Sequence, residues 1–186
     1  MTQVKRLYLI VAAAVFLTTQ LFAQPGIKGA ANITGTNVSV NTYTYLTNNA
    51  TAGTDSIRVN NSALTGTNFT TALAAGDLIL IIQMQGASIN VVNSSAFGSI
   101  SNYNNVGLYE FKCVASVPNS TTINFTSNLT NNYTSSGHVQ IVRIPRYTSF
   151  NLAAGNSIQA AAWNGNTGGI TAIEVSGNAS INGTLS

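Results

Sequence analysis

Hydrophobic and polar residues alternate over short stretches along most of the chain, and turn-forming residues separate these stretches. Alternation with a period of two is typical of β-strands, whereas an amphipathic helix repeats every three to four residues. After residue 24 no helical period is convincing, because Gly, Asn, Ser and Thr interrupt the pattern too often. The pattern predicts strands over residues 38–46, 55–59, 78–84, 107–117, 121–126 and 138–144.

The run from Leu78 to Met84 is continuously apolar apart from one glutamine and carries no charge. Such a run is typical of a central strand that is buried on both faces. Gly76 and Asp77 form the turn before it, and residues 118–120 predict a hairpin turn between two later strands. Strands at this spacing favour a β-sandwich or a small barrel-like domain over residues 40–147.

The strand predicted over residues 107–117 has two faces of different chemistry. Phe111, Cys113 and Ala115 share one face, while Glu110 and Lys112 point the other way. The sequence contains one cysteine, so no internal disulfide can form. We therefore expect Cys113 to be a small hydrophobic residue of the core, rather than a nucleophile or a ligand.

The pattern changes after Pro145, where two near-copies follow one another. Gly155-Asn156-Ser157-Ile158 and Gly177-Asn178-Ala179-Ser180-Ile181 have their glycines 22 residues apart. A short strand, a turn and a second strand at this period predict the first coils of a right-handed parallel β-solenoid over residues 148–186. The alternative is a chance echo of composition. About three coils are needed to bury an apolar face, so the open end should either pair with another structure or continue in a longer protein. We expect the second, with this segment as the truncated start of a longer solenoid.

The first residues have the pattern of a secretory signal peptide. Lys5 and Arg6 precede an apolar stretch over residues 7–17, which is too short to span a bilayer. We expect cleavage after Ala23, or else after Gln24, which leaves a linker over residues 24–39. An uncleaved anchor or a buried first helix is the alternative. No second long apolar run follows, so a secreted or bacterial cell-surface protein without a membrane span is predicted.

Composition narrows the function classes. Apolar residues make up 45% of the 186 residues and charged residues only 6%. Two of the seven Lys and Arg residues lie in the leader, which leaves five against four acidic residues, a balance of +1. This excludes a charge-driven disordered tail, a coiled coil and a basic nucleic-acid binder. Nucleic acid is therefore not an expected partner.

The reactive side chains are few. The chain has four acidic residues, one histidine and one cysteine. A zinc site typically needs three or four ligands from such residues, and no phosphate-binding or dinucleotide motif occurs. His138 is the only histidine that could serve a hydrolase as a base, and no serine elbow accompanies it. We predict no catalytic residues, no metal, no cofactor and no enzymatic activity.

Three aromatic residues are candidates for ligand binding. Tyr43 and Tyr45 alternate with threonines, so both rings lie on one face of their strand, and Trp163 is the only tryptophan. Exposed rings of this kind could stack on sugars, whereas buried rings are ordinary cross-strand packing. The sequence leaves both possibilities open.

Five stretches resemble the N-terminal region of large secreted gliding-motility-associated or adhesin-like surface proteins of gliding bacteria of the Bacteroidetes type. They are NTYTYLT at 41–47, LAAGDLILIIQMQG at 73–86, NNVGLYEF at 104–111, VQIVRIPRYT at 139–148 and AWNGNTGG at 162–169. In that family a repeat-rich body follows, commonly with a C-terminal secretion-sorting domain. The resemblance implies that this chain lacks both parts, and it supplies no catalytic residues.

These observations favour a non-catalytic N-terminal module of a secreted or cell-surface adhesin-like protein. It would cap a β-solenoid and serve surface attachment or motility. Its partners would be downstream repeats of its own longer chain and an extracellular polysaccharide or surface. The alternative is a carbohydrate-binding module that uses Tyr43, Tyr45 and Trp163. A third hypothesis is a polysaccharide-acting enzyme whose catalytic part lies beyond Ser186.

Overall fold

The computed structural model describes residues 27–186, so the predicted signal peptide at 1–23 lies outside the described residues. Strands dominate the described part of the chain, and its one helical element is the 3₁₀ turn η1 (Ser135–Gly137). The prediction of an all-β protein is confirmed.

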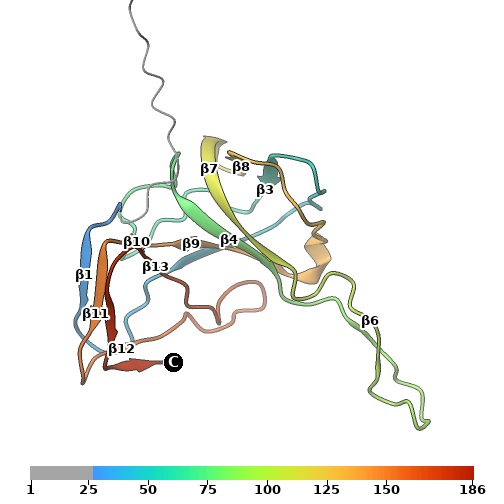
Figure 1. The fold of residues 1–186 in the computed structure, drawn as a ribbon. Helices are drawn as coiled ribbons and strands as arrows, with labels where there is room; N and C mark the ends of the chain where they lie inside the picture. Colours follow the sequence, from blue (N-terminus) through green and yellow to red (C-terminus); the bar gives the residue numbers. More distant parts are fainter. Residues whose placement is uncertain (1–26) are drawn as a thin grey trace, which may run out of the picture.

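A six-stranded antiparallel sheet forms the larger part of the molecule and curls into a half-barrel (Figure 1). Each of its strands overlaps one of the six predicted from the sequence. In sheet order they are β2 (Thr42–Tyr45), β9 (Val139–Ile144), β4 (Leu78–Gln83), β7 (Tyr109–Asn119), β8 (Thr122–Phe125) and β3 (Ser56–Arg58). The turn between β7 and β8 lies at residues 120–121, slightly later than predicted.

The two edge strands of the sheet approach each other. An isolated antiparallel bridge joins Leu46, just after β2, to Val59, just after β3. The backbone N–H of Thr47 donates to the carbonyl of Arg58 at 2.9 Å, and that of Asn60 donates to the carbonyl of Tyr45 at 3.0 Å. The sheet is therefore barrel-like, rather than one layer of a sandwich.

Strand β4 is central and packs on both faces, as its continuous apolar run predicts. Ile79 and Ile81 are fully buried in the larger core, which fills the inside of the curl. Leu80 points the other way and packs with Val142 and Ile144 in a smaller cluster. The run carries no charge because one of its faces lies in the larger core and the other is mostly covered by the smaller cluster.

Strand β7 presents the opposite face to the one we predicted. Lys112 is buried beside Glu110, and the Lys112 Nζ to Glu110 Oε2 distance is 2.9 Å. Phe111 is 54% exposed and Cys113 is only half-buried. The prediction of Cys113 as a core residue is therefore wrong. The ion pair neutralises both charges, and this allows the charged face of the strand to turn inward.

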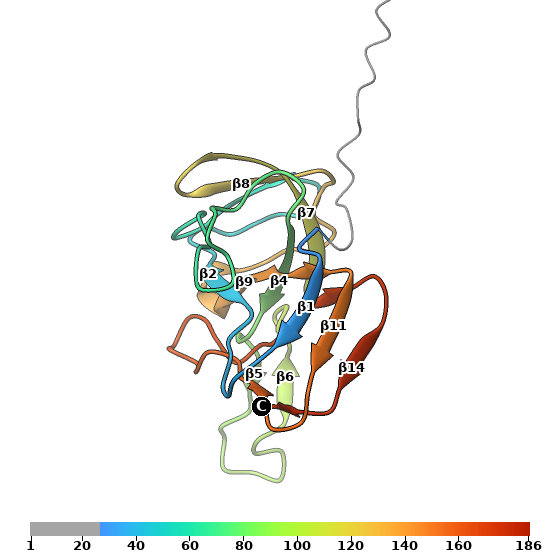
Figure 2. The same ribbon diagram turned by 90° about the vertical axis from the view of Figure 1, so that its left-hand side faces the viewer.

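Short parallel ladders form the second part of the molecule, and Figure 2 shows β1, β11 and β14 side by side. Ile33, Leu152 and Ile181 occupy one register across these strands. Two further parallel pairs and a bridge from Val38 to Ile158 extend the arrangement. The strands of these ladders are β1 (Ala30–Ile33), β10 (Arg146–Tyr147), β11 (Ser149–Leu152), β12 (Ser157–Ile158), β13 (Glu174–Val175), β14 (Ala179–Ile181) and β15 (Thr184–Leu185).

Strand β1 lies within residues 24–39, which we expected to be a linker. Ala31 and Ile33 pack against the buried cluster of β11 and β12. The side-chain amide of Asn151 donates to that of Asn32 at 2.9 Å, so the stacked asparagines hold the register on the outer side. The half-barrel is thus inserted in the chain between the first and second strands of the ladder.

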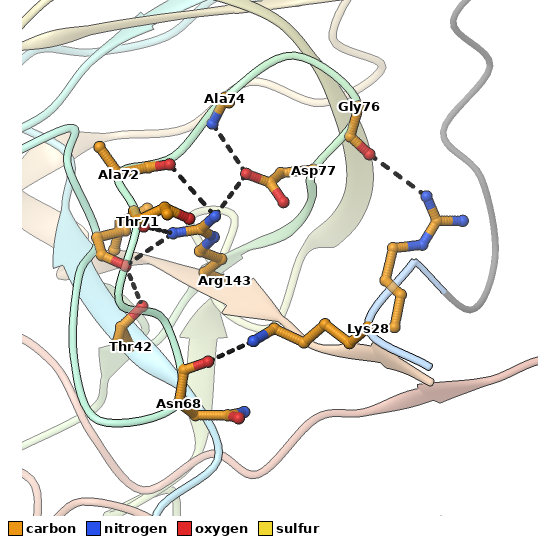
Figure 3. Close-up of polar contacts among 11 residues, drawn as sticks. Lys28, Thr42, Asn68, Thr71, Ala72, Ala74, Gly76, Asp77 and Arg143 are labelled. Carbon is orange, nitrogen blue, oxygen red and sulfur yellow. Dashed lines mark hydrogen bonds and ion pairs between the residues drawn. The ribbon is translucent and has the colours of Figure 1, made fainter. Parts of the chain in front are cut away.

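A buried arginine holds the long connection before β4 in place, and Figure 3 shows its polar contacts. The Arg143 Nη2 atom lies 2.7 Å from Asp77 Oδ2. Its guanidinium also donates to the carbonyls of Thr71 at 2.8 Å, Leu64 at 3.3 Å and Ala72 at 3.4 Å. Arg143 belongs to β9, while all of its partners belong to the long connection before β4. One side chain therefore fixes that connection against the sheet.

Two further cations extend this cluster toward the parallel strands. Arg146 pairs with Glu174, which ties β10 to β13. Lys28 donates from Nζ to the carbonyl of Asn68 (Figure 3), and its ammonium lies 4.3 Å from the centroid of the buried Phe69 ring. Burial lowers the pKa of Lys28, and the positive charge of Arg143 lowers it further.

Replacing the central arginine should destabilise the protein strongly. In Arg143→Leu, Asp77 and three carbonyl groups lose their partner in a poorly solvated site. We expect a loss of about 3–5 kcal/mol in the free energy of unfolding. Chemical denaturation measures it, and the exposed Arg58→Leu is the control, with a change within about 0.5 kcal/mol. Equal effects in the two variants would contradict the structural role of the Arg143 contacts.

The Glu110–Lys112 pair should make stability depend on acid. Burial alone would raise the pKa of Glu110, but hydrogen bonds from the N–H groups of Thr130 and Asn131 and the Lys112 ammonium together lower it. A lowered folded-state pKa stabilises the protein above the unfolded pKa, and this contribution disappears as pH falls through the folded value.

We therefore expect Glu110→Gln to be less stable than the native chain at pH 7, with the difference closing below about pH 4.5. Thermal unfolding followed from pH 7 to pH 3 measures it. Asp55→Asn removes an exposed carboxylate outside the ion pairs of the described residues and is the control. A constant gap between native and Glu110→Gln curves would refute the linkage.

Candidate functional site

A hairpin projects far from the half-barrel (Figure 1). Residues 87–103, called the arm below, contain the antiparallel strands β5 (Ser88–Ile89) and β6 (Ile100–Asn102). Its large apolar side chains are between 49% and 77% exposed: Ile89, Val91, Val92, Phe97, Ile100 and Tyr103. No charged residue lies between Asp77 and Glu110, so the arm is uncharged, and its exposed apolar side chains lie among Asn and Ser residues.

A cleft of about 920 Å³ lies at the root of the arm. One wall is the segment that returns from β6, which includes Tyr103 and Asn105. The other wall comes from η1 and the residue before it, with Thr134 and Ser136. Gln83 at the end of β4 also lines the cleft. The site is therefore assembled from three segments that are distant in the sequence.

The buried amide of Gln83 braces these segments. Its Nε2 donates to the carbonyl of Gln85 at 3.0 Å and to that of Asn104 at 2.8 Å. Its Oε1 accepts from the N–H of Thr134 at 3.0 Å. Gly137 packs so tightly here that an added Cβ would lie 2.3 Å from Gln83 Nε2. Both walls are thus fixed to the last residue of the central strand.

The wall formed by the returning segment has a special backbone. Asn104 and Asn105 both have positive φ values, 46° and 69°. Asparagine tolerates this left-handed conformation better than most residues. The Asn104 amide donates to the carbonyl of Gly86 and to the Ser88 hydroxyl, both at 2.9 Å. These bonds tie the wall to the first strand of the arm and keep the cleft preformed.

Several polar side chains of the cleft make no hydrogen bond within the fold. Within the described residues, no hydrogen bond involves the side chains of Asn105 and Ser136 or the hydroxyls of Tyr103 and Thr134. No charged side chain lines the cleft. The site offers amides, hydroxyls and one exposed ring. That chemistry suits recognition of an uncharged polar molecule, and it supplies neither a general base nor a nucleophile with an adjacent base.

The aromatic residues singled out in the sequence lie elsewhere. Tyr43 is half-buried, and its hydroxyl donates to the carbonyl of Ile170 at 2.6 Å. Burial raises the pKa of Tyr43, although hydrogen bonding opposes this. Tyr45 is half-buried opposite Gln140 on β9. Trp163 is 39% exposed and makes an edge contact with His138, with ring centroids 6.2 Å apart. The structure does not gather the three rings into one surface, and none lines the cleft.

The acidic residues are mostly committed to structure. Asp77, Glu110 and Glu174 each form an ion pair with a nearby Arg or Lys. Among residues 27–186 there is no group of three His, Cys, Asp or Glu side chains that could hold a metal ion. In the same residues no helix is long and apolar enough to cross a membrane.

The sequence interpretation missed both the arm and its cleft. Strands β5 and β6 are only two and three residues long, below the length at which alternation is detectable. The available signal was the uncharged stretch between Asp77 and Glu110, in which isolated hydrophobic residues sit among Asn and Ser. An exposed hydrophobic surface is visible there only once the hairpin is known to project.

Comparisons with known proteins give distant matches. No family model matches the sequence, and no curated protein does. Among solved structures, the tailspike gp49 of Pseudomonas phage LKA1 matches 69% of this chain and 21% of its own, at 19% identity and a TM-score of 0.37. The tailspike gp61 of Pseudomonas phage phi297 matches 63% of this chain and 18% of its own, at 14% identity and a TM-score of 0.35.

A third match is the Gp54 tailspike of Acinetobacter baumannii bacteriophage AP22, solved in complex with A. baumannii capsular saccharide. It covers 64% of this chain and 23% of its own, at 16% identity and a TM-score of 0.36. This chain therefore spans about a fifth of the length of the structures it matches. Similarity at this level is too low to carry a function over to the chain.

The brace at Gln83 is testable. Gln83→Leu keeps the approximate volume but leaves two carbonyls and one N–H without their partner, and we expect a loss of about 2–4 kcal/mol. Amide exchange at Thr134 should accelerate, because its N–H bonds to the lost Oε1. Denaturant unfolding and hydrogen exchange measure the two effects. The exposed Gln159→Leu is the control, and similar results for both variants would argue against the brace.

Proposed function

We propose that this chain is a non-catalytic attachment module of a secreted or cell-surface protein, and that the arm makes the contact. The projecting, uncharged hairpin with its six exposed apolar side chains carries this proposal. Exposed apolar side chains gathered on one projecting element mark a candidate interaction site. The signal-peptide pattern at residues 1–23 supports the location.

The parallel strands are suited to connect the half-barrel to a longer body. Our proposal is that they are the first coils of a right-handed β-solenoid. Val38, Ile158 and Leu185 occupy one register across successive strands, parallel to the row of Ile33, Leu152 and Ile181. Leu152 and Ile158 are fully buried in the middle of these rows, whereas Ile181 is 47% and Leu185 53% exposed on the last strands.

An exposed aliphatic row beside an unpaired strand edge is a template for another parallel coil. The half-barrel would then cap one end of the solenoid, with further repeats of the same longer protein as its partner. Resemblance to the N-terminal region of gliding-motility-associated surface proteins supports this arrangement, and we propose membership of that group on the five stretches given above.

A non-catalytic role agrees with the use of the charged side chains. Three of the four carboxylates neutralise Arg or Lys inside the fold, so they are not available as a facing catalytic pair. The hydroxyls and amides at the root of the arm have no neighbouring base in the cleft.

Carbohydrate binding through Tyr43, Tyr45 and Trp163 is the second candidate function. Only Trp163 among them has a substantially exposed ring, and it projects from the loop that covers Tyr43. A sugar surface here would rest on one ring together with His138, which contacts that ring at its edge. Replacement of Trp163 by alanine would abolish binding of this kind.

Attachment by the arm is tested with a paired set of variants. The double variant Val92→Ser and Phe97→Ser removes two apolar side chains at the tip, 66% and 67% exposed. These side chains would be buried on contact with an alkyl-coated sensor surface, and each contributes about 1.5–3 kcal/mol when fully covered. Their loss should therefore weaken retention on that surface at least tenfold. Quartz-crystal microbalance desorption rates measure retention.

The matched control is Tyr109→Ser with Phe111→Ser, two aromatic residues of similar exposure on β7, outside the arm. Retention in this control should stay within twofold of the native protein. If both double variants lose retention equally, or neither does, the arm is not the attachment element.

A further inference from the structure

The cleft at the root of the arm has the composition of a sugar site. We propose that it binds a segment of a neutral polysaccharide. This proposal rests on the attachment function above and adds a ligand class for the cleft. The site differs from the three aromatic residues considered in the sequence, because none of them lines it.

The uncharged lining selects the class of ligand. The cleft walls contain amides, hydroxyls and apolar groups, but no Lys, Arg, Asp or Glu. Glu110 and Lys112, which follow the lining residue Leu108 in the sequence, neutralise each other. A carboxylated, sulfated or phosphorylated glycan would find no counter-ion here and would lose hydration on entry. A neutral glycan has no such cost.

The mixture of groups matches the two surfaces of a sugar ring. A pyranose presents C–H groups on its faces and hydroxyls around its edge. The Tyr103 ring, 64% exposed, with Val106 and Leu108 offers an apolar surface for such faces. Asn105, Thr134 and other amide or hydroxyl side chains offer both donors and acceptors for the edge hydroxyls.

The walls that carry these polar side chains are also held in place before any ligand arrives. Gln83 fixes both walls, and Asn104 is bonded to Gly86 and Ser88. A preformed site loses less conformational entropy on binding, which matters for ligands whose hydroxyls bind water almost as well as protein. Its volume of about 920 Å³ lies near the top of the about 300–1,000 Å³ range of ligand sites, so it has room for more than one sugar ring.

The test is titration calorimetry of the protein with soluble oligosaccharides. The panel contains neutral gluco-, manno-, galacto- and xylo-oligosaccharides, with oligo-alginate and heparin fragments as anionic probes. We expect at least one neutral series to bind, with a dissociation constant that changes less than twofold between 50 mM and 500 mM NaCl, because no ionic contact is involved. The anionic probes should not bind in the cleft.

Variants locate the binding. Tyr103→Ala should weaken it at least tenfold through loss of the apolar surface, and Thr134→Val about threefold or more through loss of one hydroxyl at constant shape. Tyr109→Ala removes an equally exposed tyrosine outside the cleft and should leave affinity within twofold. Unchanged thermal unfolding of Tyr103→Ala, whose ring is exposed, confirms that the fold is intact.

The inference is overturned if no neutral oligosaccharide in the panel binds, if an anionic probe binds in a salt-dependent manner, or if Tyr109→Ala weakens binding as much as Tyr103→Ala. The attachment proposal is separable from these outcomes. Retention on an alkyl surface depends on Val92 and Phe97, so loss of sugar binding with native retention refutes the cleft assignment alone. Loss of retention with native sugar binding refutes the arm alone.

Discussion

A buried guanidinium holds the long connection before β4 against the sheet of the half-barrel. Arg143 pairs with Asp77 and donates to three carbonyls of this connection. These polar contacts add to the apolar packing of Leu64, Phe69 and Leu73, which the same connection buries. The neighbouring contacts of Lys28 and Arg146 reach the parallel strands on either side. Apolar contacts join the two parts as well, since Ile170 and Ala172 pack against the cluster that Leu80 forms with two residues of β9.

Most of the few charged residues in the described part of the chain form ion pairs within the fold. Solubility then depends on Asn, Ser and Thr, which occupy turns, outer ladder positions and the cleft. A surface of this kind changes little with salt or with pH near neutrality. The contacts that we propose for the arm and the cleft would accordingly depend on shape, apolar burial and hydrogen bonding.

Sequence patterns were sufficient wherever one local signal was unambiguous. The uncharged run over Leu78–Gln83 is typical of a central strand, and the structure has it there. The inward face of β7 could not be predicted, because Phe111 and Cys113 appear more hydrophobic than Glu110 and Lys112 until the ion pair is seen. Strand β1, with the sequence AANI, becomes a strand only through partners about 120 residues later.

The candidate site was also not predictable from the sequence, and Gln83 shows why. Gln83 ends the strand that fills the core, yet its side chain bonds to both walls of the cleft. Burial of an amide is unfavourable unless all its groups are bonded, so the fold can keep Gln83 only if the arm's return and η1 take up these positions. The cleft is thus a consequence of completing one buried polar group. Its geometry derives from the central strand, which gives a projecting, weakly paired hairpin a rigid base.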